Sequence, residues 1–230
     1  MMILDSIEDI DLIEPYRLQT VDILYEEEDG LIMIERRSQA VMISMNDIEK
    51  FKRLYQQFHL DSYDLYNVKQ KEIVEILKNQ YHKKDDFACI QAVYQPLEPL
   101  ELHMPQDVCI KLLTSDYIDE VYQIYHHMSD YEYIADRINQ KALWVLFQND
   151  KLAGFIGMHK EGSMGMLEVK ESYRRQGYGY LLEGYLINEL LKQKKVPFCQ
   201  VIKGNQASLA LQKRLNMTLS SRYSYWVFSD

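Results

Sequence analysis

The sequence predicts an α+β protein with a mixed sheet, organised as two domains. Aliphatic and aromatic types make up 47% of the 230 residues, which is enough for a sizeable core. Strand-like and helix-like segments alternate along the whole chain. Residues 95–105 hold three of the five prolines, and proline favours extended linker conformations. We therefore expect domains at 1–95 and 107–230, joined by a proline-rich linker at 96–106.

Composition excludes several classes of protein. The net charge of −9 argues against a general nucleic-acid binder. No run approaches the ~20 apolar residues of a membrane span, and the first residues lack the layout of a signal peptide. Cys89, Cys109 and Cys199 are odd in number and widely spaced, which argues against a disulfide framework or a zinc site. We expect a cytoplasmic monomer or homodimer without nucleic-acid, membrane or metal partners.

The first half predicts a small α+β domain. Residues 21–26 and 31–35 alternate as strands around the hairpin signal Asp29-Gly30, and residues 40–44 are a third strand candidate. A helix capped by Asn46 is expected to continue to Phe58. A second helix is expected over 69–81 and a further strand over 87–94. The acidic run 26–29 is better explained as a solvated hairpin tip than as a cation site, because metal ligands must converge from several directions.

The second half alternates more regularly. Strands are expected over 108–113, 142–148, 152–159, 164–170, 198–202 and 223–228. Helices are expected over 115–126, 131–140, 177–193 and 206–214. We expect Ser115 with Asp116 to cap the first of these helices and Asn149-Asp150 to form a tight turn. Of the nine glycines, eight follow residue 150, and two of them stand where a strand, a basic loop and a long helix follow one another.

This strand–loop–helix segment, residues 167–180, predicts an anion site. Gly177 and Gly179 allow a tight turn and a close approach of the backbone to a ligand. The first N–H groups of the following helix are free donors, and the helix dipole adds positive potential. Arg174 and Arg175 add formal charge. The alternative is an ordinary helix start, with arginines for solubility.

Two motifs then resemble those of one family. Residues 174–179 resemble the Arg/Gln-x-x-Gly-x-Gly/Ala loop that binds the pyrophosphate of acyl-CoA in the GCN5-related N-acetyltransferase (GNAT) family. Residues 205–217 resemble its Asn-x-x-Ser/Ala-x-x-Leu-x-x-x-Leu-Gly-Phe segment, and 198–202 its fifth strand. The resemblance covers about residues 108–228. Residues 211–213 and 225–228 further resemble the two-domain branch that includes glycine N-acyltransferases, in which the first half is a reduced or degenerate acetyltransferase-like domain.

The resemblance implies that acetyl-CoA is a co-substrate and that a primary amine, of a small molecule, accepts the acetyl group. The cofactor's pantetheine arm would lie along the backbone of Leu167, Glu168 and Val169. Asn205 and Ser208 would lie at the pantetheine or sulfur region. Arg174 would flank the pyrophosphate, which would contact Arg175, Gln176, Gly177, Tyr178, Gly179 and Tyr180.

The resemblance also shows two departures at catalytic positions. Gln212 stands where many members have a tyrosine acid; it can hydrogen-bond the leaving sulfur but cannot give up a proton. Ser163 stands where several members have a glutamate base. We assign the base role first to Glu168 and the sulfur contact to Gln212 or Ser208. Glu161 and the histidines at 126 and 127 are further base candidates, and a salt-bridged strand carboxylate is the equally open alternative for Glu168.

Two further expectations complete the site. Cys199 is expected to be a core strand residue rather than a nucleophile. An aromatic wall could select an aromatic or cationic acceptor, although packing of helices on the sheet explains the same tyrosines, namely Tyr122, Tyr125, Tyr131 and Tyr133. Two other functions stay open at this point: an acyl-CoA-binding module without turnover, and an acetyltransferase that acts on a protein N-terminus or lysine.

Overall fold

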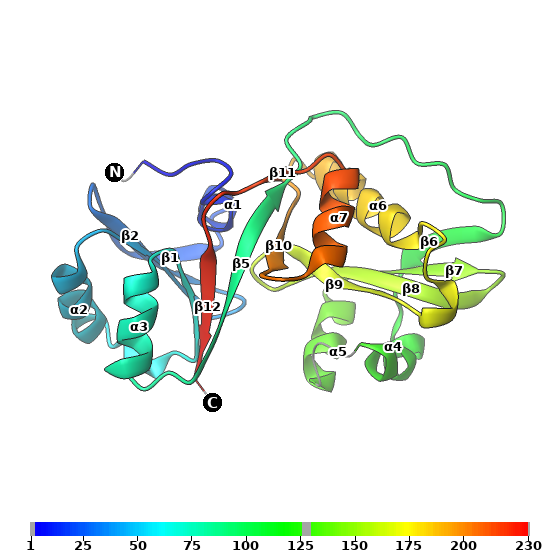
Figure 1. The fold of residues 1–230 in the computed structure, drawn as a ribbon. Coiled ribbons are helices and arrows are strands. Elements are labelled where there is room, and N and C mark those ends of the chain that lie inside the picture. Colours follow the sequence, from blue (N-terminus) through cyan, green and yellow to red (C-terminus); the bar gives the residue numbers. More distant parts are fainter. Residues whose placement is uncertain (1–2, 126–129, 230) are drawn as a thin grey trace. The chain divides into compact units, whose positions relative to one another are not determined.

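The computed structural model describes residues 3–125 and 130–229, and its contacts divide the chain into two compact units (Figure 1). The first unit comprises Met1–Ala92, Gln200–Gln206 and Leu219–Asp230. The second comprises Val93–Cys199 and Ala207–Thr218. Two stretches from the end of the chain thus group with the first unit. That residues 96–106 separate two independently folding domains stays a prediction.

The first unit is a mixed sheet with helices on both faces. Its strands follow the order β1-β2-β3-β4-β12-β5; β3 and β4 are parallel and the other neighbours are antiparallel. The helical elements are α1 (Ile10–Arg17), α2 (Ile48–Gln57), η1 (Leu60–Ser62) and α3 (Lys71–Asn79). The strands are β1 (Val21–Glu27), β2 (Gly30–Glu35), β3 (Val41–Met45), β4 (Leu65–Val68), β5 (Asp85–Val93) and β12 (Ser224–Phe228).

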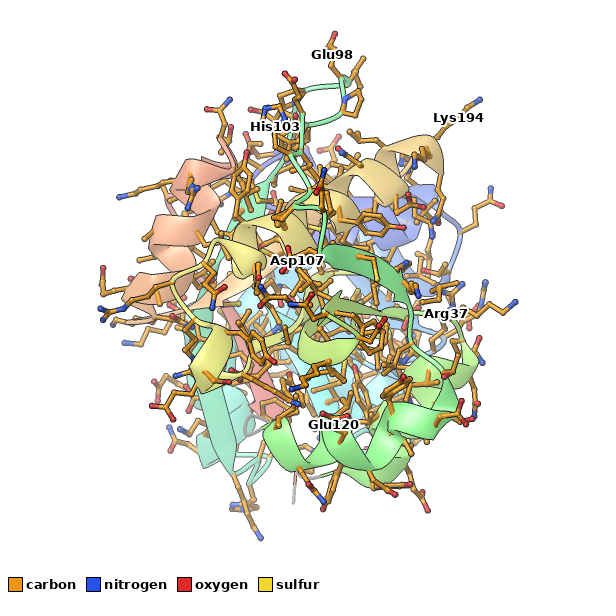
Figure 2. All side chains as sticks on the ribbon, turned by 90° about the vertical axis from the view of Figure 1, so that its right-hand side faces the viewer. Arg37, Glu98, His103, Asp107, Glu120 and Lys194 are labelled. Atoms are coloured by element: carbon orange, nitrogen blue, oxygen red, sulfur yellow. The ribbon has the colours of Figure 1, made fainter. Side chains whose placement is uncertain are left out.

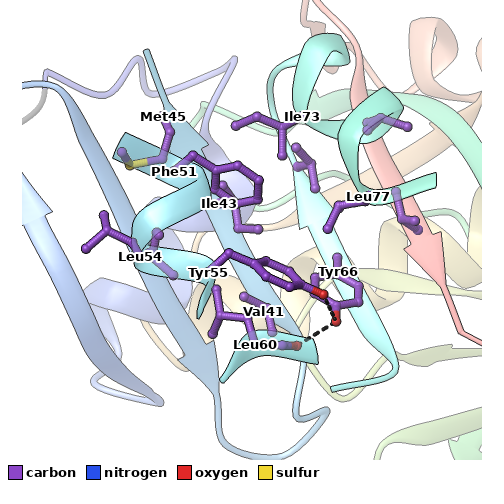
Figure 3. Close-up of a cluster of buried hydrophobic side chains, with 14 of the residues drawn as sticks. Val41, Ile43, Met45, Phe51, Leu54, Tyr55, Leu60, Tyr66, Ile73 and Leu77 are labelled. Atoms are coloured by element: carbon purple, nitrogen blue, oxygen red, sulfur yellow. Dashed lines mark hydrogen bonds between the residues drawn. The ribbon is translucent and has the colours of Figure 1, made fainter. Parts of the chain in front are cut away.

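Alternation along the strands builds a separate core on each face of this sheet. Ile32 and Ile34 of β2 point into the cluster beneath α2 and α3, whereas Leu31 and Met33 meet Leu12 of α1. The larger cluster is apolar except for two tyrosine hydroxyls (Figure 3). The Tyr66 hydroxyl donates to the Leu60 carbonyl at 2.6 Å and lies 3.4 Å from that of Tyr55. The buried phenols therefore keep hydrogen-bond partners, as burial requires.

The second unit is a sheet in the order β10-β9-β8-β7-β6, with β10 and β9 parallel and the remaining neighbours antiparallel. Helices α4 and α5 cover one face, and α6 and α7 lie on the other (Figure 1). The strands of this sheet are β6 (Val108–Leu112), β7 (Leu143–Gln148), β8 (Lys151–Met158), β9 (Met164–Val169) and β10 (Phe198–Ile202). The short β11 (Thr218–Leu219) lies outside this order and pairs with β5. The helical elements are η2 (Ser115–Tyr117), α4 (Ile118–Ile124), α5 (Tyr131–Asn139), η3 (Glu171–Tyr173), α6 (Tyr178–Lys192) and α7 (Gln206–Arg214).

Most expected elements are present, and the errors concern caps and short elements. The helix expected behind Asn46 is instead capped by Asp47, whose carboxylate accepts from the backbone N–H of Lys50 at 2.9 Å. Ser115 and Asp116 do not cap α4: they form the 3-10 turn η2, and α4 begins only at Ile118. Helix α1 and strand β4 were not expected. The acidic run at 26–29 forms the hairpin tip, where Asp29 pairs with Lys50 at 2.8 Å.

The proline-rich segment is hydrogen-bonded to α6. Asn188 of α6 accepts from the Leu100 N–H at 2.7 Å and donates to the Leu100 carbonyl at 2.9 Å. Glu98 and His103 of this segment lie at the surface (Figure 2). The segment is thus part of the second unit rather than a free spacer.

No helix among the described residues is long and apolar enough to cross a bilayer.

Candidate functional site

Strand β9 is bulged in its middle. Met166 has a left-handed φ of +54°, and the pairing of β8 with β9 shifts register between Phe155 and Gly157. A bulge adds one residue to one strand and re-aims the backbone groups and side chains that follow it. Those that follow here are Leu167, Glu168 and Val169, the three residues expected to carry the cofactor.

The edge of β9 that faces β10 is only partly used. The register between the two strands records a single pair, Cys199 opposite Met164. Among the described residues, no strand pairs with this edge of β9 beyond Met164. Residues 167–169 are half-buried. Their backbone can therefore accept an extended ligand as an additional strand would be accepted.

The loop after β9 turns sharply into α6. Arg175 and Gly177 have left-handed φ values of +63° and +83°. Gly177 is the N-cap and provides no side-chain cap, so the first-turn N–H groups are left without an intrahelical acceptor. A Cβ at Gly177 would meet no atom within 4 Å, so open space lies above this turn. Together with the helix dipole, these donors form a site for an anion.

The cations of the loop differ in their surroundings. Arg174 is about half exposed; its Nε donates to the Val169 carbonyl at 3.0 Å and its Nη2 lies 3.2 Å from Glu168 Oε1. Arg175 and Gln176 are exposed at the turn. Arg214 of α7 lies over the Tyr180 ring at 4.7 Å, and no sequence pattern predicted this third cation. Two arginines therefore belong to the loop that leads into α6, and a third contacts the first turn of this helix.

Glu168 points to the face of the sheet that α4 and α5 cover. It lies opposite Phe155, whose ring meets that of Tyr125 edge-on at 5.7 Å. Burial raises the pKa of Tyr125 to about 12, and the charge of Glu168 adds to the effect. The Glu168 side chain is 12% exposed and forms half of an ion pair with Arg174. Both readings of Glu168, base and paired strand carboxylate, are compatible with this geometry.

Other polar groups of this face form pairs of their own. The Tyr133 hydroxyl lies 3.0 Å from His159 Nδ1, and burial raises the pKa of Tyr133. Ser163 is buried and donates to Glu161 Oε1 at 2.6 Å. The histidines at 126 and 127 lie outside the described residues. The sequence missed His159 because a histidine at a strand end has no distinguishing pattern.

Tyr122 and Tyr131, the remaining residues of the expected aromatic wall, lie nearer the surface. Their rings meet edge-on at 5.3 Å, and both side chains are exposed. Tyr131 also donates to Asp119 Oδ1 at 3.1 Å. Of the four tyrosines, Tyr125 is thus buried and Tyr133 half-buried, whereas Tyr122 and Tyr131 are exposed.

On α7, Gln212 points into the protein. It is 2% exposed, and its Nε2 lies 3.2 Å from Glu183 Oε2 and 3.5 Å from Ser208 Oγ. Glu183 of α6 is buried. This burial raises its pKa to about 7, although the hydrogen bonds with Gln212 and Cys199 act in the opposite direction. Cys199 is a buried strand residue. The sequence carried a signal for Glu183, since it stands in the buried stripe with Leu186, Ile187 and Leu190 at helical spacing.

Comparison with known families bears on this arrangement. The model of the acetyltransferase (GNAT) family matches residues 109–217, which include the bulged strand, the arginine–glycine loop and α7. The chain carries a GNAT-family domain. The family transfers acetyl groups from acetyl-CoA, and the resemblance given by residues 174–179 and 205–217 is thereby confirmed. No curated protein matches the sequence.

Solved structures extend the likeness to both units. A Drosophila protein has a TM-score of 0.70 at 15% identity over 87% of this chain and 74% of its own. A GCN5-related N-acetyltransferase from Kribbella flavida has a TM-score of 0.61 at 10% identity over 95% of each chain. A tandem GNAT protein from the clavulanic acid biosynthesis pathway has a TM-score of 0.54 at 10% identity over 95% of this chain and 87% of its own. At these identities the likeness concerns the fold alone.

The predicted site residues fall into two groups. Strand β9, the loop and the start of α6 form one continuous stretch that contains all the predicted residues from Leu167 to Tyr180. Ser208 and Gln212 lie one turn apart on α7 of the same GNAT domain. Asn205, which precedes α7, is exposed and is grouped with the first unit. Its predicted contact with the cofactor stays a prediction.

Proposed function

We propose that the protein is an acyl-CoA-dependent N-acetyltransferase that moves the acetyl group of acetyl-CoA to a primary amine of a small molecule. One observation carries the proposal: in a GNAT-family domain, a bulged strand leads through an arginine loop into an uncapped helix start. Backbone N–H groups at a helix N-terminus suit a pyrophosphate. We expect the enzyme to act in the cytoplasm as a monomer or homodimer.

The substrate acetyl-CoA would be held along this stretch. Residues 175–180 would contact the pyrophosphate, with Arg174 beside it. The backbone of Leu167, Glu168 and Val169 would bind the pantetheine arm. Asn205 and Ser208 would contact the arm near its sulfur. This assignment uses the free donors of the helix start and the open edge of β9.

The reaction needs an electrophile, a neutral amine and a leaving group. A backbone N–H at the β9 bulge would polarise the thioester carbonyl, as an oxyanion hole does. The amine attacks the carbonyl carbon, the C–S bond breaks, and CoA leaves as the thiolate. The ammonium proton passes to Glu168, directly or through a water. Ser208 or Gln212 would hydrogen-bond the sulfur; a thiol pKa of about 8.5 means that the thiolate leaves without full protonation.

The first test replaces the proposed base. Glu168→Gln is expected to lower the rate by about 10²- to 10⁴-fold at neutral pH, the usual cost of losing a general base. Acetyl-CoA affinity should change little, and activity should partly recover at high pH, where free amine is present. Thiol release from acetyl-CoA with a panel of amines measures the rate, and mass spectrometry identifies the acylated amine.

Glu171→Gln is the matched control, because this exposed carboxylate lies three residues further along the chain. Full activity of Glu168→Gln together with inactivity of Gln212→Ala would reverse the two roles. A specific feature keeps a second function open: Ser163 and Gln212 replace the usual base and acid, and both are buried. Tight acetyl-CoA binding without transfer to any amine would make the protein an acyl-CoA-binding module instead.

A further inference from the structure

A buried carboxylate in the GNAT domain has no part in the proposed reaction. Glu183 is 3% exposed, and its hydrogen-bond partners are neutral: the Gln212 amide and the Cys199 thiol. The nearby charged residues of α7, Lys213 and Arg214, are exposed. On its other side, the helix packs Gly184 against Leu102 of the proline-rich segment. The carboxylate is therefore buried without an ion pair among the described residues, which is a costly arrangement.

The amide that contacts Glu183 is only half satisfied. Gln212 Nε2 faces both Glu183 and Ser208, whereas Gln212 Oε1 is buried and has no hydrogen-bond partner among the described residues. An ionised carboxylate only accepts hydrogen bonds, so it holds the NH₂ side of the amide toward itself. A protonated carboxyl group donates one, and this favours the opposite orientation, with Oε1 toward Glu183.

The two orientations present different groups to Ser208. When Nε2 faces Ser208, the hydroxyl oxygen accepts from the amide and directs its proton to other partners. When Oε1 faces Ser208, the hydroxyl proton is drawn toward the amide. A hydroxyl has a single proton to donate, so the orientation of Gln212 decides whether the amide oxygen competes for that proton with the other acceptors around Ser208.

We propose that Glu183 is a positioning residue: through the Gln212 amide it sets whether the Ser208 hydroxyl donates to the sulfur of bound coenzyme A. The inference rests on the proposed function, because Ser208 is expected in the pantetheine or sulfur region from the family resemblance. Ionised Glu183 favours the donating arrangement. Contact with the sulfur should therefore strengthen as the pH rises through the titration of Glu183, which burial moves to about neutral pH.

The experiment compares binding of coenzyme A with that of desulfo-coenzyme A, which lacks the sulfur, by calorimetry between pH 5.5 and 8.5. For the wild-type chain, the preference for coenzyme A should increase by about two- to tenfold through pH 7, the value of one hydrogen bond. Glu183→Gln keeps an acceptor for Gln212 but cannot titrate. At every pH, this variant should show the preference that the wild-type chain reaches at high pH. Ionisation of the coenzyme A thiol adds the same pH dependence to all variants.

Ser208→Ala provides a second variant at a half-buried position. It should abolish the titration while Glu183 remains in place, and adding Glu183→Gln to it should have no further effect on the preference. If wild type and Glu183→Gln, or wild type and Ser208→Ala, show the same pH profile, this inference is overturned and the proposed function is not. Failure of the folded wild-type chain to bind coenzyme A at any pH would overturn the proposed function, and the inference with it.

Discussion

At the scale of single residues, Gly177 tests the anion site most directly. Its φ of +83° strains any side chain, and a Cβ there would project into open space above the first turn of α6. Gly177→Val is expected to lower affinity for coenzyme A at least tenfold, because the side chain would fill the space a pyrophosphate needs. Arg175→Ala should weaken binding less, since backbone N–H groups supply much of the contact. Calorimetry on the folded variants measures both effects.

Gly162 offers a matched control for strain without the ligand. It also has a left-handed φ, +101°, and lies in the turn before β9. A Cβ added at Gly162 would meet no atom within 4 Å. Gly162→Val should destabilise the protein to a similar degree and leave coenzyme A affinity unchanged. Equal losses of affinity in the two variants would show that strain, rather than the occupied space, explains the result at Gly177.

Glu183 also predicts a pH-dependent stability. Burial raises its pKa from an ordinary 4.5 to about 7, so folding favours the protonated form. The stability that this gives is present in acid and is lost as the pH rises through 7. Relative to Glu183→Gln, the wild-type chain should therefore lose up to about 3 kcal/mol of unfolding free energy between pH 5 and 8. Urea unfolding at several pH values measures this difference.

Glu189→Gln on the same helix is the control for this measurement. Glu189 pairs with the exposed Lys192 at 2.6 Å, and such a pair contributes at most about 1 kcal/mol. Its effect should be small and nearly constant over the same pH range. A difference between wild type and Glu183→Gln that does not vary with pH would mean that Glu183 does not titrate in this range.

At the scale of elements, α6 links the loop at residues 174–177 to the proline-rich segment. Asn188 makes two hydrogen bonds to the backbone of Leu100, and Asn188→Ala removes both. We expect a loss of about 1–2 kcal/mol of stability and faster hydrogen exchange at the Leu100 amide. Lys192→Ala, exposed at the end of the same helix, should change neither. Unchanged exchange at Leu100 in Asn188→Ala would show that the segment is held elsewhere.

Elements also show why the sequence predicted some features and missed others. Long amphipathic or alternating segments such as α6, α7 and β10 were predicted to within a residue or two because periodicity reports the buried face. Strand β4 has four residues, too few for a pattern, and α1 contains Pro15, which argues against a helix interior. The bulge at Met166 was invisible, since it arises from pairing with β8 and not from local sequence.

At the scale of the whole molecule, the order of the chain does not match its division into units. Strand β12 comes from the last residues, yet it lies between β4 and β5 of the first unit and pairs with both. Trp226 and Val227 are buried there, and Trp226 donates to Gln200 at 2.6 Å. The sequence predicted this strand but not its partners, because pairing between distant segments leaves no local pattern.

The first unit should therefore depend on residues more than a hundred positions away. A fragment of residues 1–95 lacks β12 and would expose the facing edges of β4 and β5 together with the core around Val227. We expect this fragment to be unfolded by circular dichroism and amide hydrogen exchange. Joining residues 222–229 to residue 95 through a short glycine–serine turn should restore folding, because β12 runs antiparallel to β5. The same fusion with Val227→Asp, which buries an unpaired charge, should stay unfolded. A fragment 1–95 that unfolds cooperatively, with the stability of the fusion, would instead establish the boundary at 96–106 as a true folding boundary.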